Sequence, residues 1–129
     1  MIRATALVAA LAAALLATGC GQKIEVSKSQ PTLRDGAVLF HEHCSGCHSL
    51  AVADSRGSKP TRILQHGERT NGPNFNVRHV DKQDALFAIR NGGFSGAIMP
   101  ANVVVGRDAD LVAGFLASCT GRKPAPACK

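Results

Sequence analysis

Cys44-Ser45-Gly46-Cys47-His48 is the stretch that decides how this chain folds. Two cysteines separated by two residues and followed at once by a histidine form the attachment signature of c-type haem. On a helical turn Cys44 and Cys47 share one face, so each sulfur can bond one of the two vinyl groups of a porphyrin. His48 then lies beneath the ring and can give its imidazole nitrogen to the iron. The stretch therefore predicts one covalent haem c, bound through Cys44 and Cys47, with His48 as an axial ligand.

Two other kinds of site also use closely spaced cysteines. A zinc site needs a second pair of ligands, and the remaining cysteines, Cys119 and Cys128, are not spaced as such a pair. A thioredoxin-like redox site needs strands and helices that alternate around the motif, and the sequence shows no such alternation. Haem attachment is therefore the preferred interpretation.

The composition agrees with a cofactor-filled core. The chain has 129 residues, enough for one domain, with no Tyr or Trp and only 4% aromatic residues. Large apolar side chains are therefore scarce, and a buried haem would supply the missing apolar bulk. Lys and Arg outnumber Asp and Glu by 15 to 9, which gives a formal net charge of +6.

The N-terminal 31 residues are expected to serve export and anchoring. Residues 1–19 combine a basic start at Arg3, a short apolar segment and small residues before Cys20, which indicates a secretory signal. Small residues directly before a cysteine resemble the lipobox of bacterial lipoproteins, and this resemblance implies that Cys20 is acylated and becomes the mature N-terminus. Ordinary signal cleavage after Ala17-Thr18-Gly19 is the alternative. Residues 20–31 are polar and lack periodicity, so we expect a flexible tether.

Three stretches have the apolar spacing of amphipathic helices. The first is expected to begin at Thr32, because Thr32-Leu33-Arg34-Asp35 has the form of a capping box. The second opens at Asp81 and stops at Arg90-Asn91-Gly92-Gly93, and the third runs from about Arg107 to Cys119. Strand-forming patterns are almost absent, so the expected fold class is all-α.

A long loop is expected over residues 49–80, which lack a sustained period and are rich in turn-forming residues. A loop of this length would normally count against a compact domain. Here it can pack on the edge of a haem instead of on other elements. A short helix over residues 61–65 is one option within it.

The order of these features resembles that of class I cytochrome c. The matching positions are Gly36, Phe40, the haem motif, Gly72-Pro73, Met99-Pro100 and an apolar last helix with Phe115. The resemblance covers Thr32 to Cys119. It implies the class I cytochrome c fold, with few helices and long loops around one haem, and a close crossing of the first and last helices at Gly36. The cytochrome c domain is thus expected at residues 32–121, with a C-terminal tail at 122–129.

The resemblance also assigns roles to individual residues. It makes Met99 the second axial ligand of the iron, and it implies that the carbonyl of Pro73 accepts a hydrogen bond from His48, which would fix the imidazole. His66 and His79 remain alternative distal ligands if the long loop folds over the haem, whereas His41 and His43 lie on the proximal side. Phe75 stands where an aliphatic residue is common.

An iron with two axial ligands from the protein has no open position, which suits electron transfer rather than catalysis. We therefore expect a mono-haem, one-electron carrier that is not an enzyme. It would be exported to the extracytoplasmic, periplasmic side of a bacterial membrane and anchored there by lipidated Cys20. The resemblance suggests a quinol–cytochrome c reductase and a haem–copper oxidase as redox partners, with no nucleic acid and no small-molecule substrate.

Two other functions stay open at this point. The domain can be a fixed haem-relay subunit of a larger oxidoreductase or oxidase complex. It can also be a haem enzyme or ligand sensor with an open iron site, which the assignment of Met99 disfavours.

Cys119 and Cys128 remain as an even pair once the other three cysteines are assigned. Export would place them in an oxidising compartment, so we expect a disulfide that holds the tail against the last helix. Two free thiols are the alternative.

Basic residues lie in the segments that are expected to border the haem: Arg56, Lys59, Arg62, Arg69, Arg78 and Lys82. Together they would steer an acidic partner toward the haem edge.

Overall fold

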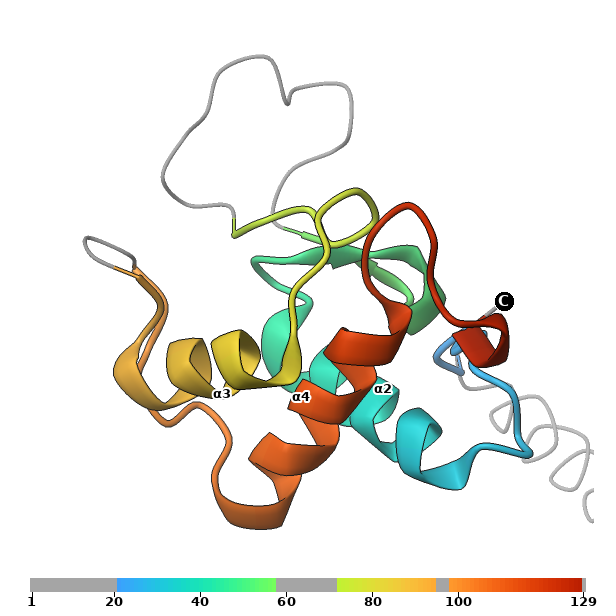
Figure 1. The fold of residues 1–129 in the computed structure, drawn as a ribbon, viewed down its shortest axis with the longest axis horizontal. Coiled ribbons are helices and arrows are strands. Elements are labelled where there is room, and N and C mark those ends of the chain that lie inside the picture. The colour runs from blue at the N-terminus through green and yellow to red at the C-terminus, as the bar shows by residue number, and fades with distance from the viewer. Residues whose placement is uncertain (1–20, 58–71, 95–97, 129) are drawn as a thin grey trace, which may run out of the picture.

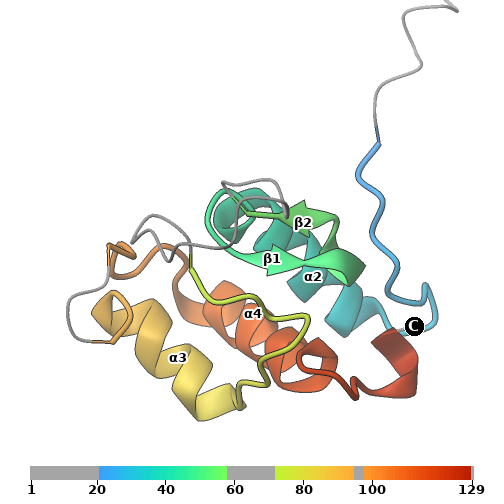
Figure 2. The same ribbon diagram turned by 90° about the horizontal axis from the view of Figure 1, so that it is seen from above.

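Three α-helices dominate the described part of the computed structural model, which comprises residues 21–57, 72–94 and 98–128. They are α2 (Pro31–Cys44), α3 (Lys82–Asn91) and α4 (Gly106–Cys119). α4 packs against both other helices and lies between them (Figures 1 and 2). The expected all-α class is therefore confirmed. None of the helices in these residues is both long and apolar enough to cross a membrane.

A very small sheet follows the haem motif. β1 (Ser49–Leu50) and β2 (Ser55–Arg56) pair antiparallel, and the 3₁₀ turn η1 (Ala51–Ala53) connects them (Figure 2). Asp54 makes the return possible by adopting a left-handed conformation with φ of 49°. The hydroxyl of Ser55 donates to the carbonyl of His48, so the sheet fixes the backbone at the end of the motif.

The start of α2 differs from the expected capping box. Pro31 is the first helical residue, and Gln30 is the N-cap without a side-chain hydrogen bond. A proline suits this position because its fixed φ is already helical and its missing N–H would have no partner there. Thr32 therefore lies inside the first turn, where its hydroxyl does not cap the helix.

α2 and α4 cross at close range at Gly36, as the resemblance to class I cytochrome c implies. A Cβ added to Gly36 would lie 2.7 Å from the Cβ of Phe115 and would collide with the carbonyl of Leu111. Beside this contact, the rings of Phe40 and Phe115 pack with their centroids 5.9 Å apart, and each is at most 1% exposed. The absence of a side chain at Gly36 is what brings these two rings into one core.

α3 begins and ends as the sequence predicts. The side chain of Asp81 caps its start by accepting a hydrogen bond from the backbone N–H of Asp84. Gly92 ends it in a left-handed conformation with φ of 81°. Both signals are local, so they hold whatever the helix packs against.

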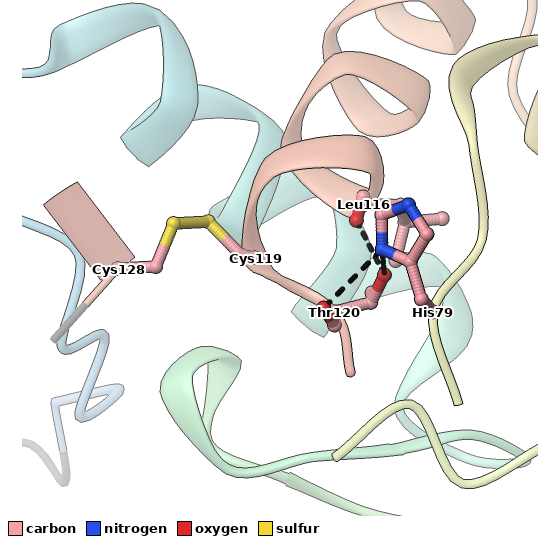
Figure 3. Close-up of a disulfide and its surroundings, with 5 residues drawn as sticks. All are labelled: His79, Leu116, Cys119, Thr120 and Cys128. Atoms are coloured by element: carbon pink, nitrogen blue, oxygen red, sulfur yellow. Dashed lines mark hydrogen bonds between the residues drawn. A yellow bond between two sulfur atoms is a disulfide. The ribbon is translucent and has the colours of Figure 1, made fainter. Parts of the chain in front are cut away.

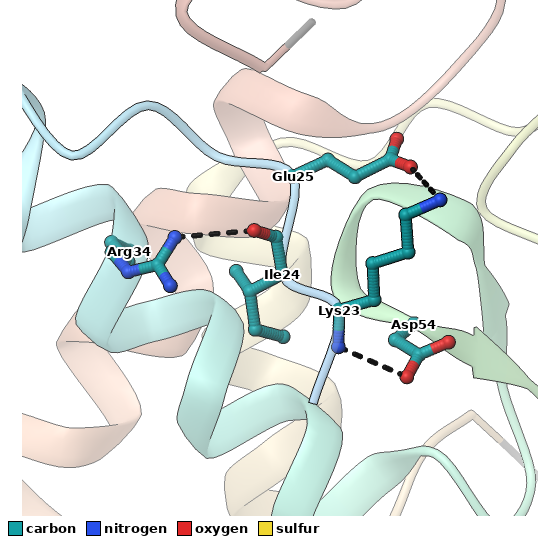
Figure 4. Close-up of polar contacts among 5 residues, drawn as sticks. All are labelled: Lys23, Ile24, Glu25, Arg34 and Asp54. Carbon is teal, nitrogen blue, oxygen red and sulfur yellow. Dashed lines mark hydrogen bonds and ion pairs between the residues drawn. The ribbon is translucent and has the colours of Figure 1, made fainter. Parts of the chain in front are cut away.

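The segment expected to be a flexible tether is packed against the domain from Lys23 onward (Figure 4). Ile24 is 9% exposed and Val26 is 2% exposed. The guanidinium of Arg34 donates to the carbonyls of Ile24 at 3.1 Å and Val26 at 2.9 Å, and the N–H of Glu25 donates to Val52 at 2.9 Å. The expectation of a tether over residues 20–31 is therefore corrected, because the alternation of Ile24, Glu25 and Val26 turns one side of an extended chain to the core. Cys20 lies outside the described residues.

Cys119, at the end of α4, and Cys128, in the 3₁₀ turn η3 (Pro126–Cys128), form a disulfide with their Cα atoms 5.4 Å apart (Figure 3). This is the pair that the sequence predicts. The N–H of Ala125 donates to the carbonyl of Ser118 at 2.9 Å, and both cysteines are buried. The tail is thus folded back on the last helix.

Removing this disulfide is expected to lower stability. The double variant Cys119→Ala/Cys128→Ala should lose about 2–3 kcal/mol of unfolding free energy, because the short closed loop no longer restricts the unfolded chain. Denaturant unfolding of the holoprotein measures the loss. As a control, alkylation of the unfolded wild type without reductant, followed by intact-mass measurement, should leave both cysteines unlabelled; labelling of both would refute the pairing.

Candidate haem site

The haem motif is positioned by the end of α2. The N–H groups of Cys47 and His48 both donate to the carbonyl of Cys44, at 3.1 Å and 3.0 Å. The chain therefore makes a tight turn immediately after the helix. Cys44 is buried and Cys47 is exposed, and both are free thiols.

Cys44, Cys47 and His48 line a cavity of about 650 Å³. This volume lies in the usual range for cofactor sites. The cavity is bounded by α2, by the segment after Gly72, by α3 and α4, and by the segment around Met99. Most of the side chains on its wall are apolar: Phe40, Phe75, Val80, Ala85, Ala88, Ile89, Phe94, Ile98, Met99, Val103, Val112 and Leu116.

The imidazole of His48 is oriented by Pro73. Its Nδ1 atom lies 3.3 Å from the Pro73 carbonyl oxygen, the contact that the sequence comparison with class I cytochrome c implies. With Nδ1–H donating to that carbonyl, the lone pair of Nε2 remains available. Burial lowers the pKa of His48, while the bond to Pro73 acts in the opposite direction. The lowered pKa favours the neutral imidazole, which is the form in which histidine binds metals.

Cys44 does not have the properties of a redox-active cysteine. Burial raises the pKa of its thiol to about 12, and the neighbouring Cys47 adds to the effect. Thiol–disulfide exchange needs a thiolate with a lowered pKa, so the structure disfavours that alternative. As to zinc, the described residues contain no group of three or more His, Cys, Asp or Glu side chains able to hold a metal ion.

Met99 lies on the wall of the same cavity as His48, in the segment between α3 and α4. The end of α3 holds this segment in place. The N–H of Asn102 donates to the carbonyl of Ile89 at 2.7 Å, and Gly92 packs so closely that an added Cβ would lie 2.9 Å from the Met99 carbonyl oxygen. The thioether is thus presented to the cavity by a fixed backbone.

The comparison with known families decides what this arrangement is. A family model described as cytochrome c matches residues 33–120. The chain belongs to the cytochrome c family. No match is found among curated proteins. Membership makes the chain a haem-based electron-transfer protein, and it implies a covalently bound haem c.

The residues of this cytochrome c fit such a group. The cavity is mainly apolar, two free thiols line it, and the side chains of His48 and Met99 lie on its wall. Gly72 adds a further sign of fit, since its N–H donates to the carbonyl of Cys47 at 2.8 Å and its Cα packs against the His48 ring.

Of the histidines considered as distal ligands, His79 is not among the residues that line the cavity of the cytochrome, and its ring faces Thr120 instead (Figure 3). Its Nδ1 lies 3.4 Å from both the carbonyl and the hydroxyl oxygens of Thr120, just after α4. His41 contacts the carbonyl of Ala53 at 2.9 Å. His43 lies at the cavity edge on α2, beside Cys44. His66 falls outside the described residues, as does the option of a helix over 61–65.

Sequence reasoning missed the contact between Phe75 and His48 in this cytochrome. Their ring centroids lie 4.8 Å apart, with planes inclined by 10°. The only available signal was the aromatic side chain at a position where an aliphatic one is common.

Gly72→Ala is expected to displace the His48 ring of the cytochrome. An added Cβ would lie 2.7 Å from Nε2, and the backbone cannot retreat without breaking its bond to Cys47. Overpacking of this kind costs about 1–3 kcal/mol, so thermal unfolding of the holoprotein should occur at a lower temperature. Gly114→Ala on α4 is the control, because an added Cβ there meets no atom within 4 Å. Equal unfolding temperatures for the two variants would contradict the close contact.

Proposed function

We propose that this cytochrome c is a mono-haem carrier that moves one electron at a time between redox proteins at the extracytoplasmic face of a bacterial membrane. The observation that carries the proposal is the shared cavity. It brings the imidazole of His48, the thioether of Met99 and the free thiols of Cys44 and Cys47 to one largely apolar space.

Haem bound in this cavity would supply an iron centre that changes between two oxidation states by one electron. Cys44 and Cys47 would hold it through thioether bonds, and His48 and Met99 would be its axial ligands. Pro73 keeps the imidazole oriented, so that little structural change need accompany electron transfer. A methionine ligand favours a higher reduction potential than a second histidine does. The proposal assigns no substrate turnover to the chain.

The cavity reaches the surface beside two exposed apolar side chains. Phe94 is 54% exposed and Ile98 is 65% exposed, and both also line the cavity. Arg78 is an exposed cation on the same wall. Asp84 also places an exposed carboxylate on this wall, so Arg78 would be the residue that directs an acidic redox partner to dock here, close to the haem. Lys59, Arg62 and Arg69 of the expected basic rim fall outside the described residues, and Lys82 pairs with Asp110 at 3.3 Å.

Electron exchange with an acidic redox partner is expected to slow as ionic strength rises. Electrostatic steering raises association rates by about 10–10³-fold and is screened by salt. Arg78→Glu should reduce the rate at low salt and flatten its salt dependence, whereas Arg122→Glu, which is exposed but remote from the cavity wall, should change neither. Stopped-flow measurement over a range of salt concentrations gives both quantities. A wild-type rate that is indifferent to salt would remove the docking role.

The proposed anchor is the lipid on Cys20, and the support for it is the lipobox-like sequence before that residue. Cys20→Ser should move the holoprotein from the membrane fraction to the soluble periplasmic fraction. Recovery of the wild type in the soluble fraction would contradict the anchor.

Free movement between partners distinguishes a carrier from a fixed subunit. The family resemblance suggests a quinol–cytochrome c reductase as donor and a haem–copper oxidase as acceptor. Isolation from the native membrane in mild detergent should yield the haem protein alone. Stable co-purification with a catalytic chain would favour the haem-relay subunit of a larger oxidoreductase or oxidase complex.

A further inference from the structure

The ring of Phe75 lies flat against the imidazole of His48. The centroids are 4.8 Å apart, and the planes are inclined by only 10°. Phe75 is 8% exposed, so water has little access to the contact. The other phenylalanine near this imidazole, Phe40, is placed differently, with its centroid 6.3 Å from that of His48 and its plane tilted by 53°.

The backbone of Phe75 is fixed on both sides of this stack. Its N–H donates to the carbonyl of Ser49 at 2.9 Å, and its carbonyl accepts from the N–H of Gly121 at 2.8 Å. Ser49 follows His48 directly, and Gly121 lies just beyond α4. The ring of Phe75 also packs edge-on against Phe40, with the centroids 6.1 Å apart. The stack therefore cannot open without disturbing the small sheet or the end of α4.

The imidazole is restrained on three sides in consequence. Pro73 accepts its Nδ1–H, Gly72 packs against its ring atoms, and Phe75 covers one face. The contacts with Pro73 and Gly72 fix the position of the imidazole. The ring of Phe75 also interacts electrostatically with the charge on the imidazole. The face of a benzene ring carries partial negative charge, so it attracts a positively charged partner placed over it.

We propose that Phe75 is a positioning residue that holds the plane of the His48 imidazole and favours the oxidised haem over the reduced one. The inference rests on the proposed role of His48 as an iron ligand. An imidazole bound to Fe(III) carries more positive charge than one bound to Fe(II), so the ring face of Phe75 attracts it more strongly in the oxidised protein. By analogy with cation–π contacts, the preference is about two- to fivefold in the equilibrium between the two states.

Phe75→Leu tests this preference, since leucine keeps the site apolar but has no ring face. Its midpoint potential should be more positive than that of the wild type by about 20–40 mV, which is a two- to fivefold change at 59 mV per tenfold. The proton shifts of the haem methyl groups in the ferric protein should also change, because they report the orientation of the axial imidazole plane. Phe115→Leu is the matched control. It removes a buried ring that does not line the cavity, and it should lower stability without moving the potential in this way.

Pentafluorophenylalanine at position 75 gives a second test that does not depend on tolerance of leucine. Fluorination keeps the shape of the ring and reverses the sign of charge on its face, so the potential should again become more positive. A potential equal to that of the wild type after fluorination, or equal shifts in Phe75→Leu and Phe115→Leu, would overturn the inference. These outcomes leave the proposed function intact, which would instead fail if the wild type carried no covalent haem or showed no histidine ligation.

Discussion

His48→Ala is expected to abolish the stable holoprotein, and Cys44→Ser or Cys47→Ser is expected to weaken covalent attachment. The imidazole lies on the cavity wall beside both thiols, and its Nδ1 atom is held by the carbonyl of Pro73. Without the His48 imidazole, the described residues of the cavity would offer the iron no ligand at the position of His48. Denaturing electrophoresis with haem staining measures attachment, because thioether bonds survive unfolding.

His43→Ala is the matched control for this experiment. His43 is exposed on α2 one residue before Cys44 and also reaches the cavity edge, so it tests whether any histidine near the motif suffices. The variant should keep its haem and its spectrum. Extraction of haem from the wild type by acid–acetone would show that the attachment is not covalent and would end the proposed role of both cysteines.

Met99→Ala is expected to lower the reduction potential on the order of 0.1 V, a part of the roughly 0.8 V that axial ligands span. Loss of the thioether removes the ligand that favours the reduced iron. The vacated position should also let the ferrous protein bind carbon monoxide. Redox titration and absorption spectra before and after carbon monoxide measure both effects. The ferric wild type should show the weak red absorption band of sulfur-to-iron charge transfer, and the variant should lack it.

Val103→Ala and His79→Ala are the controls for Met99. Val103 lies on the same cavity wall without a ligating atom, and His79 is bound to Thr120. Neither variant should bind carbon monoxide. An unaltered spectrum in Met99→Ala would exclude methionine ligation and would direct attention to His66.

The parts of this molecule that could be predicted from sequence are those set by neighbours along the chain. Asp81 caps α3 three residues before its partner N–H, and Gly92 ends that helix with its own conformation. The haem motif is likewise a local pattern of five residues. Gly36 was a weaker signal, because a glycine within an apolar stripe indicates only that another helix approaches closely. The resemblance to a family in which two helices cross at a glycine identified the last helix as that neighbour.

The features that sequence reasoning did not reach depend on residues far away along the chain. Val26 and Ile24 are held by Arg34, and Glu25 by Val52, so the polar composition around them hid a packed segment. The start of α2 was misplaced for a simpler reason, since the favourable first-turn position of Pro31 was overlooked. The stack of Phe75 on His48 could not be foreseen, because it needs Ser49 and Gly121 to fix the backbone from two directions.

The packed N-terminal segment has a consequence for how the carrier would reach its partners. The N–H of Lys23 already bonds to the Asp54 carboxylate at 3.2 Å, so only residues 21 and 22 would separate the domain from the lipid proposed on Cys20. Three chain steps span at most about 11 Å. The domain would then stay close to the bilayer, with little variation in its height above the surface. Encounters would depend on two-dimensional diffusion of the anchored protein, and a partner whose docking site stands far above the membrane surface would be excluded by distance alone.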